Sequence, residues 1–579
     1  MSKTTATPDA CGNLSAGGET SGEMLVRVYE YGCAREAIRG MDAAIDQILR
    51  RNELWNRIVE IDNEIRTKMD AVLHAGPQED HLAGLRQGLT ELRTRLAQVR
   101  ADAKSSLIDS AQLVAQIRTA VVEIQTILAE VKQIRKANAR ENRPLLRELN
   151  SERLRRIQEA QVSAGLYWCN RTAVVRNYEV ARARAMKEGR RLKGRLCNGA
   201  GSVCVYFQRG LQVAAVFGDN GRLQIDPVPE EAWNSPSRST RRRLARTNVR
   251  MRVAVNAGGP VWLELPMTMH RPLPEGAVIR WATIVREQIG LAWRHRLLLT
   301  VRTPACQNAR SADAVGVDLG WRITPEGLRV AYWCGTDGRH GTLVLRRADL
   351  LAFKQIGALQ SAIKAAHEQA KSFLRSYLDR QALPAPLMER ASAALSSPSP
   401  RLLVTLLQEW RASRFSGDRY GFGRISAWQK QHIHLWTWQA NLRDQLIRKR
   451  RELYRCFAAE LASRYGIAFV NDVPLRRIVK RSLVVCENIP AQRQNRFVAA
   501  VSVLVRILQN AFEKNSGTLT RIQSAGAMMA CYSCGTLDQW NPAETLTHTC
   551  SHCCTTWDQD FNASLNLLRR GLAARDDTC

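Results

Sequence analysis

Residues 531–566 read CYSCGTLDQWNPAETLTHTCSHCCTTWDQDFNASLN, and this stretch says most about the fold. It contains two Cys-x-x-Cys pairs separated by fifteen residues: Cys531, Cys534, Cys550 and Cys553. Four thiolates at this spacing are the ligand set of a tetrahedral Zn²⁺ site, with His552 and Cys554 as alternative ligands. Because four thiolates leave no open coordination position, we expect a structural zinc ribbon and not a catalytic centre.

Acidic residues follow apolar segments at three places in the second half of the chain. Asp318 lies in the apolar strand AVGVDLGW (314–321), and Asp560 lies in DQDFNASLN (558–566), which opens a final helix. Between them, the strand GIAFVNDVPL (466–475) ends in Asn471 and Asp472. A carboxylate in a buried strand is costly unless it meets a cation. RNase H-like and RuvC-like nucleases use such residues to hold Mg²⁺, although Asp560 could also cap its helix.

The charge balance indicates a large anionic partner. Lys and Arg number 85 against 54 Asp and Glu, a formal net charge of +31. Nucleic acid is the usual partner of such a chain, because each neutralised phosphate releases condensed counterions. The sequence has no apolar run of about 18 residues, so we expect no membrane partner and a cytoplasmic protein.

Periodicity divides the first half into three parts. Residues 1–21 are small and polar, and we expect a disordered leader there. Apolar residues then recur at helical spacing over 82–99 and 113–134, which predicts two long antiparallel helices. From about 196 to 304 the period changes to two, in segments such as VCVYF (203–207) and VRMRVAV (249–255), which predicts a β-barrel or sandwich.

Two basic clusters are candidate nucleic-acid contacts. The first lies between two expected strands, in an expected loop, and comprises Arg238, Arg241, Arg242 and Arg243. The second lies on the helix before GIAFVNDVPL and comprises Arg448, Lys449, Arg450 and Arg451. Guanidinium groups suit phosphate recognition, whereas a solvated loop is the alternative for the first cluster.

The order GVDLGW, NDVPL, Cys₄ ribbon and DQDFNASLN resembles the transposon-encoded TnpB proteins and the type V CRISPR-Cas effectors related to them. The resemblance covers about 315–570, and its most specific part runs from Cys531 to Asn566. The VYEYGC opening (28–33), the GVDLGWR motif and the length look most like subtype V-M.

This resemblance implies an α+β multidomain, bilobed protein that binds a CRISPR guide RNA and a double-stranded DNA target with a flanking motif. A monomer carrying one guide RNA is expected. The implied parts are a first wedge strand (22–35), a helical recognition lobe (36–195), a β-barrel wedge domain (196–310) and a RuvC-like domain (311–520). A zinc-ribbon insert (521–556) and the RuvC-like C-terminal helix (557–579) follow.

The chain departs from the family at the second of the three acidic positions. The family has a Glu there, whereas this chain has Asn471. Neighbouring strand residues point to opposite faces, so Asp472 cannot simply replace the missing carboxylate, and Glu487 is another substitute to consider. Asp318 and Asp560 could hold one Mg²⁺, but a two-metal site would lack ligands. We therefore expect weak or absent cleavage.

Three functions remain open from the sequence. The first is an RNA-guided DNA-binding effector of antiviral or anti-plasmid defence that silences its target by binding. The second is an active Mg²⁺-dependent RNA-guided endonuclease, whose site Asp472 or Glu487 completes. The third is a guide-independent nucleic-acid-binding zinc protein accessory to a transposase.

Overall fold

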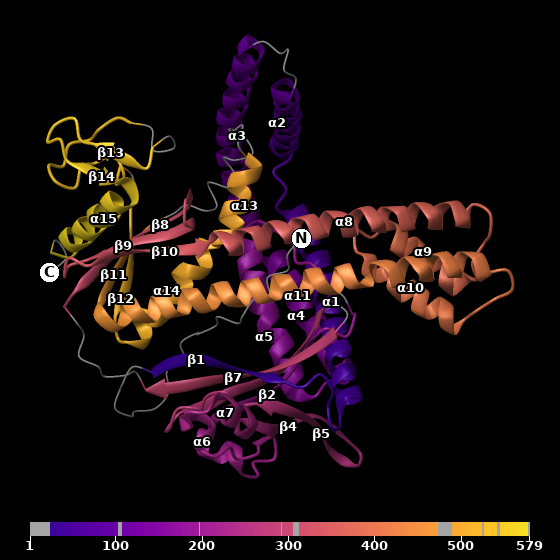
Figure 1. Ribbon diagram of the computed structural model, residues 1–579. Coiled ribbons are helices and arrows are strands. Elements are labelled where there is room, and N and C mark those ends of the chain that lie inside the picture. Colours follow the sequence, from indigo (N-terminus) through magenta and orange to yellow (C-terminus); the bar gives the residue numbers. More distant parts are fainter. Residues whose placement is uncertain are drawn as a thin grey trace. The chain divides into compact units, whose positions relative to one another are not determined.

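The computed structural model describes residues 24–101, 107–195, 197–290, 292–304, 312–472, 489–523, 526–540 and 545–576 (Figure 1). The predicted leader (1–21) and Glu487 lie outside the described residues. The chain divides into two compact units. Unit 1 contains Val26–Glu287 and Arg294–Thr303, and unit 2 contains Gln288–Trp293 and Pro304–Cys579. The chain is a mixed α+β protein with several sheets.

Unit 1 contains a seven-stranded sheet with the strand order β2-β6-β7-β1-β5-β4-β3. Its strands are β1 (Met24–Cys33), β2 (Gly201–Gln212), β3 (Leu223–Ile225), β4 (Arg246–Asn256), β5 (Gly259–Thr268), β6 (Val278–Ile289) and β7 (Ala292–Pro304). The N-terminal strand β1 thus joins strands that follow it by more than a hundred residues. Alternate residues such as Val249, Met251 and Val253 are fully buried, as the period of two predicts.

The predicted closed barrel is not confirmed. Among the described strands, β2 and β3 stand at the two ends of the sheet order, so the sheet is open. Alternation along a strand reports which residues are buried on one face, but it does not report whether the first and last strands pair. Three short helices connect the strands: the 3₁₀ helix η1 (Val213–Phe217), α6 (Glu231–Asn234) and α7 (Arg238–Leu244).

The longer helices of unit 1 lie between β1 and β2 in the sequence. They are α1 (Met41–Val72), α2 (Pro77–Ala101), α3 (Leu107–Glu141), α4 (Arg143–Ser163) and α5 (Trp168–Lys187). The predicted pair of long helices is confirmed by α2 and α3, which pack side by side (Figure 1). Leu82, Leu89 and Leu96 recur every seven residues on α2 and are buried with Ile117, Ile124 and Val131 of α3.

Unit 2 contains a five-stranded sheet with the order β10-β9-β8-β11-β12. Its strands are β8 (Ala314–Thr324), β9 (Gly327–Gly335), β10 (His340–Arg346), β11 (Ile467–Asn471) and β12 (Thr518–Ile522). The strands β8, β9 and β10 form an antiparallel meander, whereas β11 is parallel to both β8 and β12. A separate two-stranded ribbon pairs β13 (Thr547–Thr549) with β14 (Thr556–Asp558).

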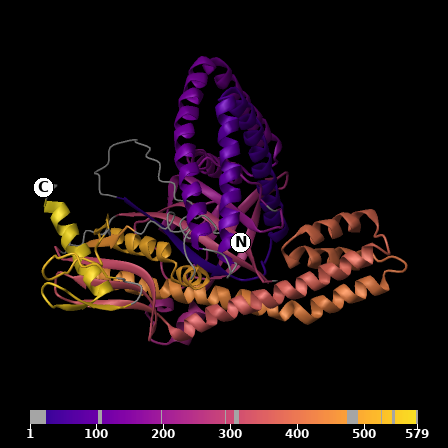
Figure 2. The same cartoon turned by 90° about the horizontal axis from the view of Figure 1, so that it is seen from above.

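The helices of unit 2 are α8 (Arg347–Leu378), α9 (Ala385–Ser396), α10 (Pro400–Ala412), α11 (Arg419–Arg464), α13 (Ile489–Ala499), α14 (Val501–Lys514) and α15 (Gln559–Asp576). The long helices α8 and α11 pack along each other, and α9 and α10 pack near their far end (Figure 2). Trp410, which is fully buried, anchors that end among Leu374, Leu403 and Ile425.

The two faces of the sheet in unit 2 have different partners. Val315 and Val317 of β8 belong to the large core that includes residues of α11 and α14. The alternate residues face α15, because Ala314 packs with Leu568 and a Cβ on Gly316 would lie 2.2 Å from the carbonyl oxygen of Ser564. Asp318, two residues further along β8, therefore lies on the α15 face.

No helix in the described part of the chain has the length and apolar character that crossing a bilayer requires.

Candidate functional site: an acidic pocket and a four-cysteine ribbon

The strand register brings two of the predicted residues together at the ends of adjacent parallel strands. Val470 of β11 pairs with Val317 of β8, so Asn471 and Asp318 follow at the same level of the sheet. The Asn471 Nδ2 donates a hydrogen bond of 2.7 Å to Asp318 Oδ1 and one of 3.1 Å to the Leu319 carbonyl oxygen. Asn471 Oδ1 accepts from the Leu319 amide at 3.0 Å. The Asn471 side chain thus forms hydrogen bonds with both the Asp318 carboxylate and the Leu319 backbone.

This double role explains why Asn fits the position. An amide side chain offers both a donor and an acceptor, whereas an ionised carboxylate offers acceptors alone. A Glu at Asn471 would place a second negative charge beside Asp318 and could not donate to it. Both side chains are buried, at 9% exposure for Asp318 and 8% for Asn471. The position therefore stabilises Asp318 as a hydrogen-bond acceptor and adds no charge to the pocket.

Asp560 reaches the same pocket from the first turn of α15. It does not cap the helix, because Asp558 does: Asp558 Oδ1 accepts from the Asp560 amide at 2.9 Å and from the Phe561 amide at 3.3 Å. Asp560 is thereby free to point at the sheet, where it is 9% exposed. Asp558 is a pocket residue that sequence reasoning missed, although the Asp-x-Asp spacing in DQDFNASLN was a signal for it.

Arg329 of β9 completes the pocket and was also missed. Its Nη1 lies 2.7 Å from Asp558 Oδ2 and 3.0 Å from Asp560 Oδ2, so one guanidinium nitrogen bridges two carboxylates. The neighbours of Arg329 in β9, Leu328 and Val330, belong to the core on the opposite face. Asp318 pairs with Tyr332 of β9, three residues from Arg329, and the pairing is irregular between these positions, so simple alternation does not place Arg329 in the pocket.

Burial and nearby negative charge raise the pKa values of two carboxyl groups in the pocket, those of Asp318 and Asp560. Burial, followed by the charge of Asp560, holds the pKa of Asp318 well above its ordinary value. Burial, followed by the charge of Asp558, raises the pKa of Asp560, and Arg329 partly offsets that rise. The pocket is therefore an environment in which negative charge is expensive, and it needs a cation or hydrogen-bond donors.

The donor set of the pocket does not fit the Mg²⁺ predicted at Asp318 and Asp560. A hard cation requires carboxylate oxygens with free lone pairs directed at one point. Here Asp318 Oδ1 accepts from Asn471, and Asp560 Oδ2 accepts from Arg329. In the described part of the chain, the four ribbon cysteines are the one group of at least three His, Cys, Asp or Glu close enough to share an ion.

Asp472, one of the two substitutes considered for the missing carboxylate, does not complete the pocket. Asp472 is 60% exposed, and its Oδ1 lies 3.9 Å from Arg521 of β12. Its backbone amide donates to the Ile522 carbonyl at 2.9 Å, which continues the pairing of β11 with β12. Asp472 thus points away from Asp318, as expected for neighbours in a strand.

The four predicted cysteines come together in unit 2. Their sulfur atoms all lie within 4.8 Å of one another. Two of the separations are 3.6 Å, between Cys531 and Cys553 and between Cys534 and Cys550. Four ligands about 2.3 Å from a central zinc would lie at such separations. These thiols can hold a metal ion such as zinc, and neither His552 nor Cys554 belongs to the group.

The two cysteine pairs form equivalent turns. The Gly535 amide donates to the Cys531 carbonyl at 2.9 Å, and the Cys554 amide donates to the Cys550 carbonyl at 3.1 Å. The Ser533 and His552 amides each donate to a cysteine sulfur at 3.4 Å. Such amide donors stabilise the negative charge of a thiolate, so the turns prepare the sulfurs for a cation.

The two turns differ at one equivalent position, which is Gly535 in the first turn and Cys554 in the second. Gly535 has φ 78° and Cys554 has φ 58°, both in the left-handed region that favours glycine. Cys554→Gly is therefore expected to raise the free energy of unfolding of the ribbon by about 0.5–1 kcal/mol. Hydrogen exchange of the Thr555 and Thr556 amides, compared with that in Cys554→Ala, measures this change. Equal or faster exchange in the glycine variant would contradict it.

Two asparagines of α15 attach the first cysteine turn to the helix. Asn562 Nδ2 donates to the Ala530 carbonyl at 2.8 Å, and its Oδ1 accepts from the Tyr532 amide at 2.8 Å. Asn566 Nδ2 donates to the Ala527 and Ala530 carbonyls at 2.9 and 2.7 Å. The Asp-x-Asn-Ala-x-x-Asn pattern thus has two roles: Asp560 faces the pocket, and the two asparagines hold the ribbon.

The first basic cluster lies in a helix and not in a loop. All four arginines, Arg238, Arg241, Arg242 and Arg243, lie within α7, and the side chain of the N-cap residue Ser237 accepts from the Thr240 amide. A helix was not predicted because seven residues are too few to show an apolar period. All four arginines are exposed. The prediction that they contact nucleic acid is consistent with this exposure and stays a prediction.

The prediction that the second basic cluster contacts nucleic acid is wrong for Arg450. This side chain is buried at 8% exposure, and its Nη1 donates to the Phe497 and Val498 carbonyls at 3.2 and 2.6 Å. Arg448 pairs with Asp444 at 3.0 Å and Lys449 pairs with Asp349 at 2.6 Å, both with exposed cationic side chains. Arg451 is exposed. A helix that packs on one side necessarily turns one member of a four-residue basic run inward.

Removing Arg450 is expected to destabilise the protein. Arg450→Met should lower the free energy of unfolding by about 1.5–3 kcal/mol, because the α13 carbonyls lose a charged donor. Arg448→Met, the control, removes only an exposed pair on the same helix and should cost about 0.3–0.5 kcal/mol. Urea midpoints of the two variants measure the difference. A midpoint for Arg450→Met equal to that of the control would show that the buried contacts contribute little.

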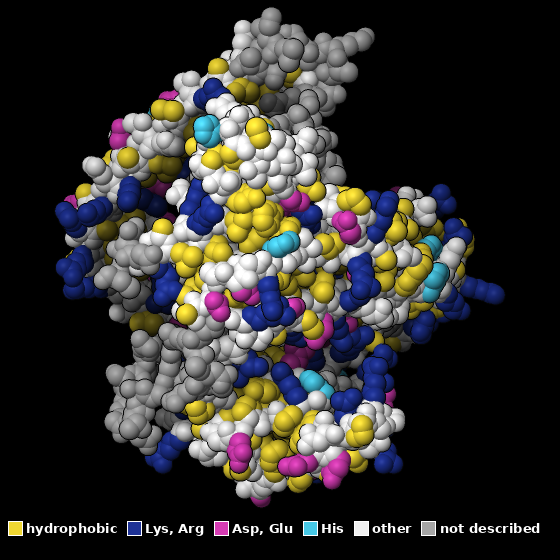
Figure 3. All heavy atoms as spheres, turned by 60° about the vertical axis from the view of Figure 1, so that its left-hand side comes forward, with side chains coloured by type: hydrophobic (Ala, Val, Ile, Leu, Met, Phe, Trp, Pro, Cys, Tyr) yellow, Lys and Arg dark blue, Asp and Glu magenta, His cyan; other side chains and the backbone are white. Residues whose placement is uncertain are grey.

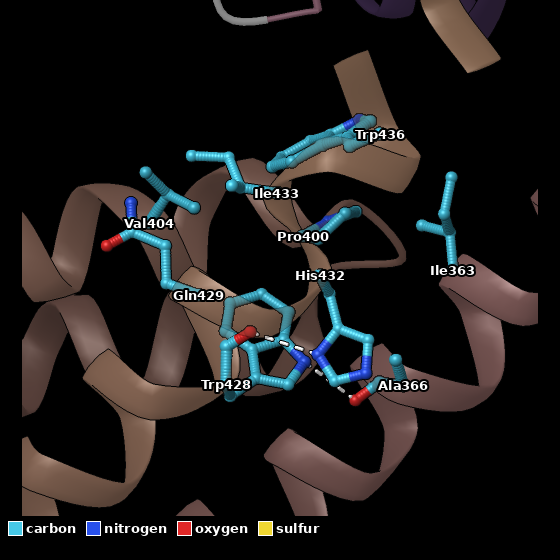
Figure 4. Close-up of a pocket in the computed structure, with 9 residues that line it drawn as sticks. All are labelled: Ile363, Ala366, Pro400, Val404, Trp428, Gln429, His432, Ile433 and Trp436. Carbon is cyan, nitrogen blue, oxygen red and sulfur yellow. Dashed lines mark hydrogen bonds between the residues drawn. The ribbon is translucent and has the colours of Figure 1, made fainter. Parts of the chain in front are cut away.

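A small cavity between α8, α10 and α11 is not a ligand site. Trp428, His432 and Trp436 line it (Figure 4), and its volume is about 20 Å³, enough for about one water molecule. His432 Nδ1 lies 3.0 Å from the Trp428 carbonyl, and Trp428 Nε1 donates to the Ala366 carbonyl at 2.9 Å. This histidine therefore has a packing role.

The face shown in Figure 3 carries Lys and Arg side chains in many places, with fewer Asp and Glu among them. This distribution agrees with the excess of positive charge in the composition. It favours contact with an extended polyanion over recognition of a single small anion.

Two curated relatives match almost the whole chain. The "CRISPR-associated DNA-binding protein Cas12m" of Thermanaerosceptrum fracticalcis is 34% identical over 95% of this chain and 94% of its own length. The protein of the same name from Allomeiothermus silvanus is 30% identical over 94% of this chain and 97% of its own length.

No protein-family model matches the chain. Among solved structures, a Cas12f1 chain from a complex with sgRNA and target DNA aligns with 94% of this chain at 11% identity and a TM-score of 0.39. The two full-length relatives establish the relationship, and they confirm the resemblance to subtype V-M effectors. The chain belongs to the Cas12m family.

Proposed function

We propose that this protein is a CRISPR RNA-guided effector that binds double-stranded DNA and silences its target by binding, with weak or absent cleavage. One observation carries the second half of this proposal: the Asn471 amide, in place of a carboxylate, donates to Asp318 at 2.7 Å. The relatives, which are named DNA-binding proteins, and the net charge of +31 support the first half.

The proposed partners are a CRISPR guide RNA and a DNA target with a short flanking motif, bound by a monomer with one guide. In such a complex base pairing reads the target sequence, while the protein holds the backbone of the RNA–DNA duplex. We assign the helices within 36–195 to the recognition lobe and the seven-stranded sheet, with its first strand in 22–35, to the wedge domain (196–310). The sheet of unit 2 belongs to the RuvC-like domain.

Zinc is the metal proposed for the four cysteines. Four thiolates at the observed separations leave no open position, so the ion would be structural. It would hold the ribbon (521–556) against α15, where Asn562 and Asn566 already bind its first turn. The ribbon would then present its exposed side to nucleic acid.

An active endonuclease is less well supported. Asp558 does bring a third carboxylate to Asp318 and Asp560, but Arg329 pairs with it at 2.7 Å. A guide-independent zinc protein accessory to a transposase is the remaining alternative, and it differs in one outcome: it would bind DNA without sequence preference.

Isolation of the native complex tests the proposal. The RNA that copurifies is sequenced, and binding of a guide-matched duplex is compared with that of a duplex mismatched next to the flanking motif. We expect a CRISPR-derived RNA and binding of the matched duplex alone. Equal binding of both duplexes would contradict guided binding.

The exposed arginines of α7 are expected to contribute to RNA affinity. Replacing Arg241, Arg242 and Arg243 together by Gln should weaken guide RNA binding and reduce the slope of log K against log salt by roughly 2–3. A matched control replaces Arg50, Arg57 and Arg155, which already pair with Asp46, Glu60 and Glu159. It changes the net charge equally. Filter binding over a salt series measures both variants, and equal slopes would argue against a phosphate contact at α7.

A further inference from the structure

The acidic pocket contains its own cation. Three carboxylates, Asp318, Asp558 and Asp560, lie on the α15 face of the sheet or at the start of α15. Arg329 pairs with two of them, and its side chain is 12% exposed, so the pair is largely removed from water. A guanidinium stays protonated at any physiological pH, and its charge is therefore permanent.

A second arginine adds to this effect. In the register of β8 against β9, Arg322 is the direct partner of Arg329. The charge of Arg322 lowers the pKa of both Asp318 and Asp560. Two arginines, Arg329 and Arg322, thus partly balance the negative charge of the pocket. Asn471 adds a neutral hydrogen-bond donor to Asp318.

A guanidinium and a divalent cation compete for the same oxygens. Asp560 Oδ2 is 3.0 Å from Arg329 Nη1, so a metal ligated by that oxygen would lie beside a fixed positive charge. The metal would have to displace Arg329 from Asp560 and would place two positive charges side by side in a largely buried pocket, which is unfavourable.

We propose that Arg329 is the permanent counter-ion of this pocket and takes the place of a divalent metal, so that the RuvC-like site is stable and closed without Mg²⁺. This inference rests on the proposed function and deepens it, because it names a second residue, besides Asn471, that separates binding from cutting. If Arg329 is the counter-ion, Asn471→Glu alone should not restore a metal site.

Titration with Mn²⁺ alone tests the counter-ion. The full chain without RNA, with its ribbon metal retained, is titrated, and free Mn²⁺ is followed by electron paramagnetic resonance. Wild type and Asp318→Ala should show the same weak background. Arg329→Ala should gain one site at least about tenfold tighter than that background, and the double variant Arg329→Ala/Asp318→Ala should lose it.

Arg414→Ala is the matched control. Arg414 pairs at 2.7 Å with Asp418, a side chain that is 4% exposed, and this pair involves a single carboxylate where Arg329 bridges two. Its removal also leaves a buried carboxylate without its cation, yet it should create no Mn²⁺ site. Thermal midpoints give an independent readout: Mn²⁺ should raise the midpoint of Arg329→Ala and leave that of wild type unchanged.

A Mn²⁺ site that is present in wild type and lost in Asp318→Ala would overturn the proposal. This comparison needs no Arg329 variant, and Arg329→Gln replaces Arg329→Ala if the alanine variant does not fold. Absence of a new site in a folded Arg329→Gln would also overturn it. Guided binding is measured separately, by the shift of a matched duplex by the RNA-loaded wild type without Mn²⁺, so either result can fail alone.

Discussion

Replacing Cys531 by Ser is expected to abolish metal binding at the ribbon and to unfold residues 526–540 and 545–558. Cys531 is 1% exposed, and its sulfur lies 3.6 Å from that of Cys553, so no solvent ligand can replace it without opening the cluster. The ribbon has a small core of its own, comprising Cys531, Cys550 and Trp557 with three partly buried neighbours. Structural zinc supplies roughly 10–16 kcal/mol in isolated zinc modules, far more than so small a core.

The measurement is the zinc content of the purified chain, together with hydrogen exchange over the ribbon. We expect about one zinc per chain in wild type and none in Cys531→Ser. Cys554→Ser is the control, because Cys554 is exposed and lies outside the cluster. Retention of zinc by Cys531→Ser, or its loss from Cys554→Ser, would contradict this assignment of ligands.

The second large effect is expected at Gly316, where α15 packs most closely on β8. A Cβ there would lie 2.2 Å from the Ser564 carbonyl oxygen and 2.8 Å from the Leu568 amide nitrogen. Both are backbone atoms of a helix and cannot turn aside as a side chain can. Gly316→Ala should therefore force α15 away from the sheet and lower the free energy of unfolding by about 3 kcal/mol or more.

Gly320→Ala is the matched control on the same strand, because a Cβ there meets nothing within 4 Å. Urea unfolding followed by tryptophan fluorescence compares the two variants. The displacement of α15 would also move Asp560 and the asparagines that hold the ribbon, so Gly316→Ala should lose guided DNA binding. Equal urea midpoints for the two alanine variants would contradict the close packing.

The parts of the site that the sequence predicts are those encoded locally. The cysteine spacing predicts two turns, and the apolar segments around Asp318 and Asn471 predict two strands, which are β8 and β11 in the structure. The Asp-x-Asn-Ala-x-x-Asn pattern fixes which residues share a face of α15. Each inference needs only the period of a helix or strand and the short reach of a turn.

The parts that it misses depend on register and on packing between distant segments. Arg329 is an ordinary strand residue until the pairing of β9 with β8 places it on the α15 face. In the sequence, Arg450 cannot be distinguished from its exposed neighbours, and only the packing of α13 against α11 provides the carbonyl to which it donates. The open order of the seven-stranded sheet depends on which strands are last, and no period along a strand reports that.

Binding and cutting measured in the same sample test the central claim most directly. The RNA-loaded protein is mixed with a guide-matched duplex labelled on both strands in Mg²⁺, and the shifted complex is recovered and analysed on a denaturing gel. We expect a guide-dependent shift in which both strands stay at full length. Strands that are cut in wild type and left whole by Asp318→Ala would contradict it.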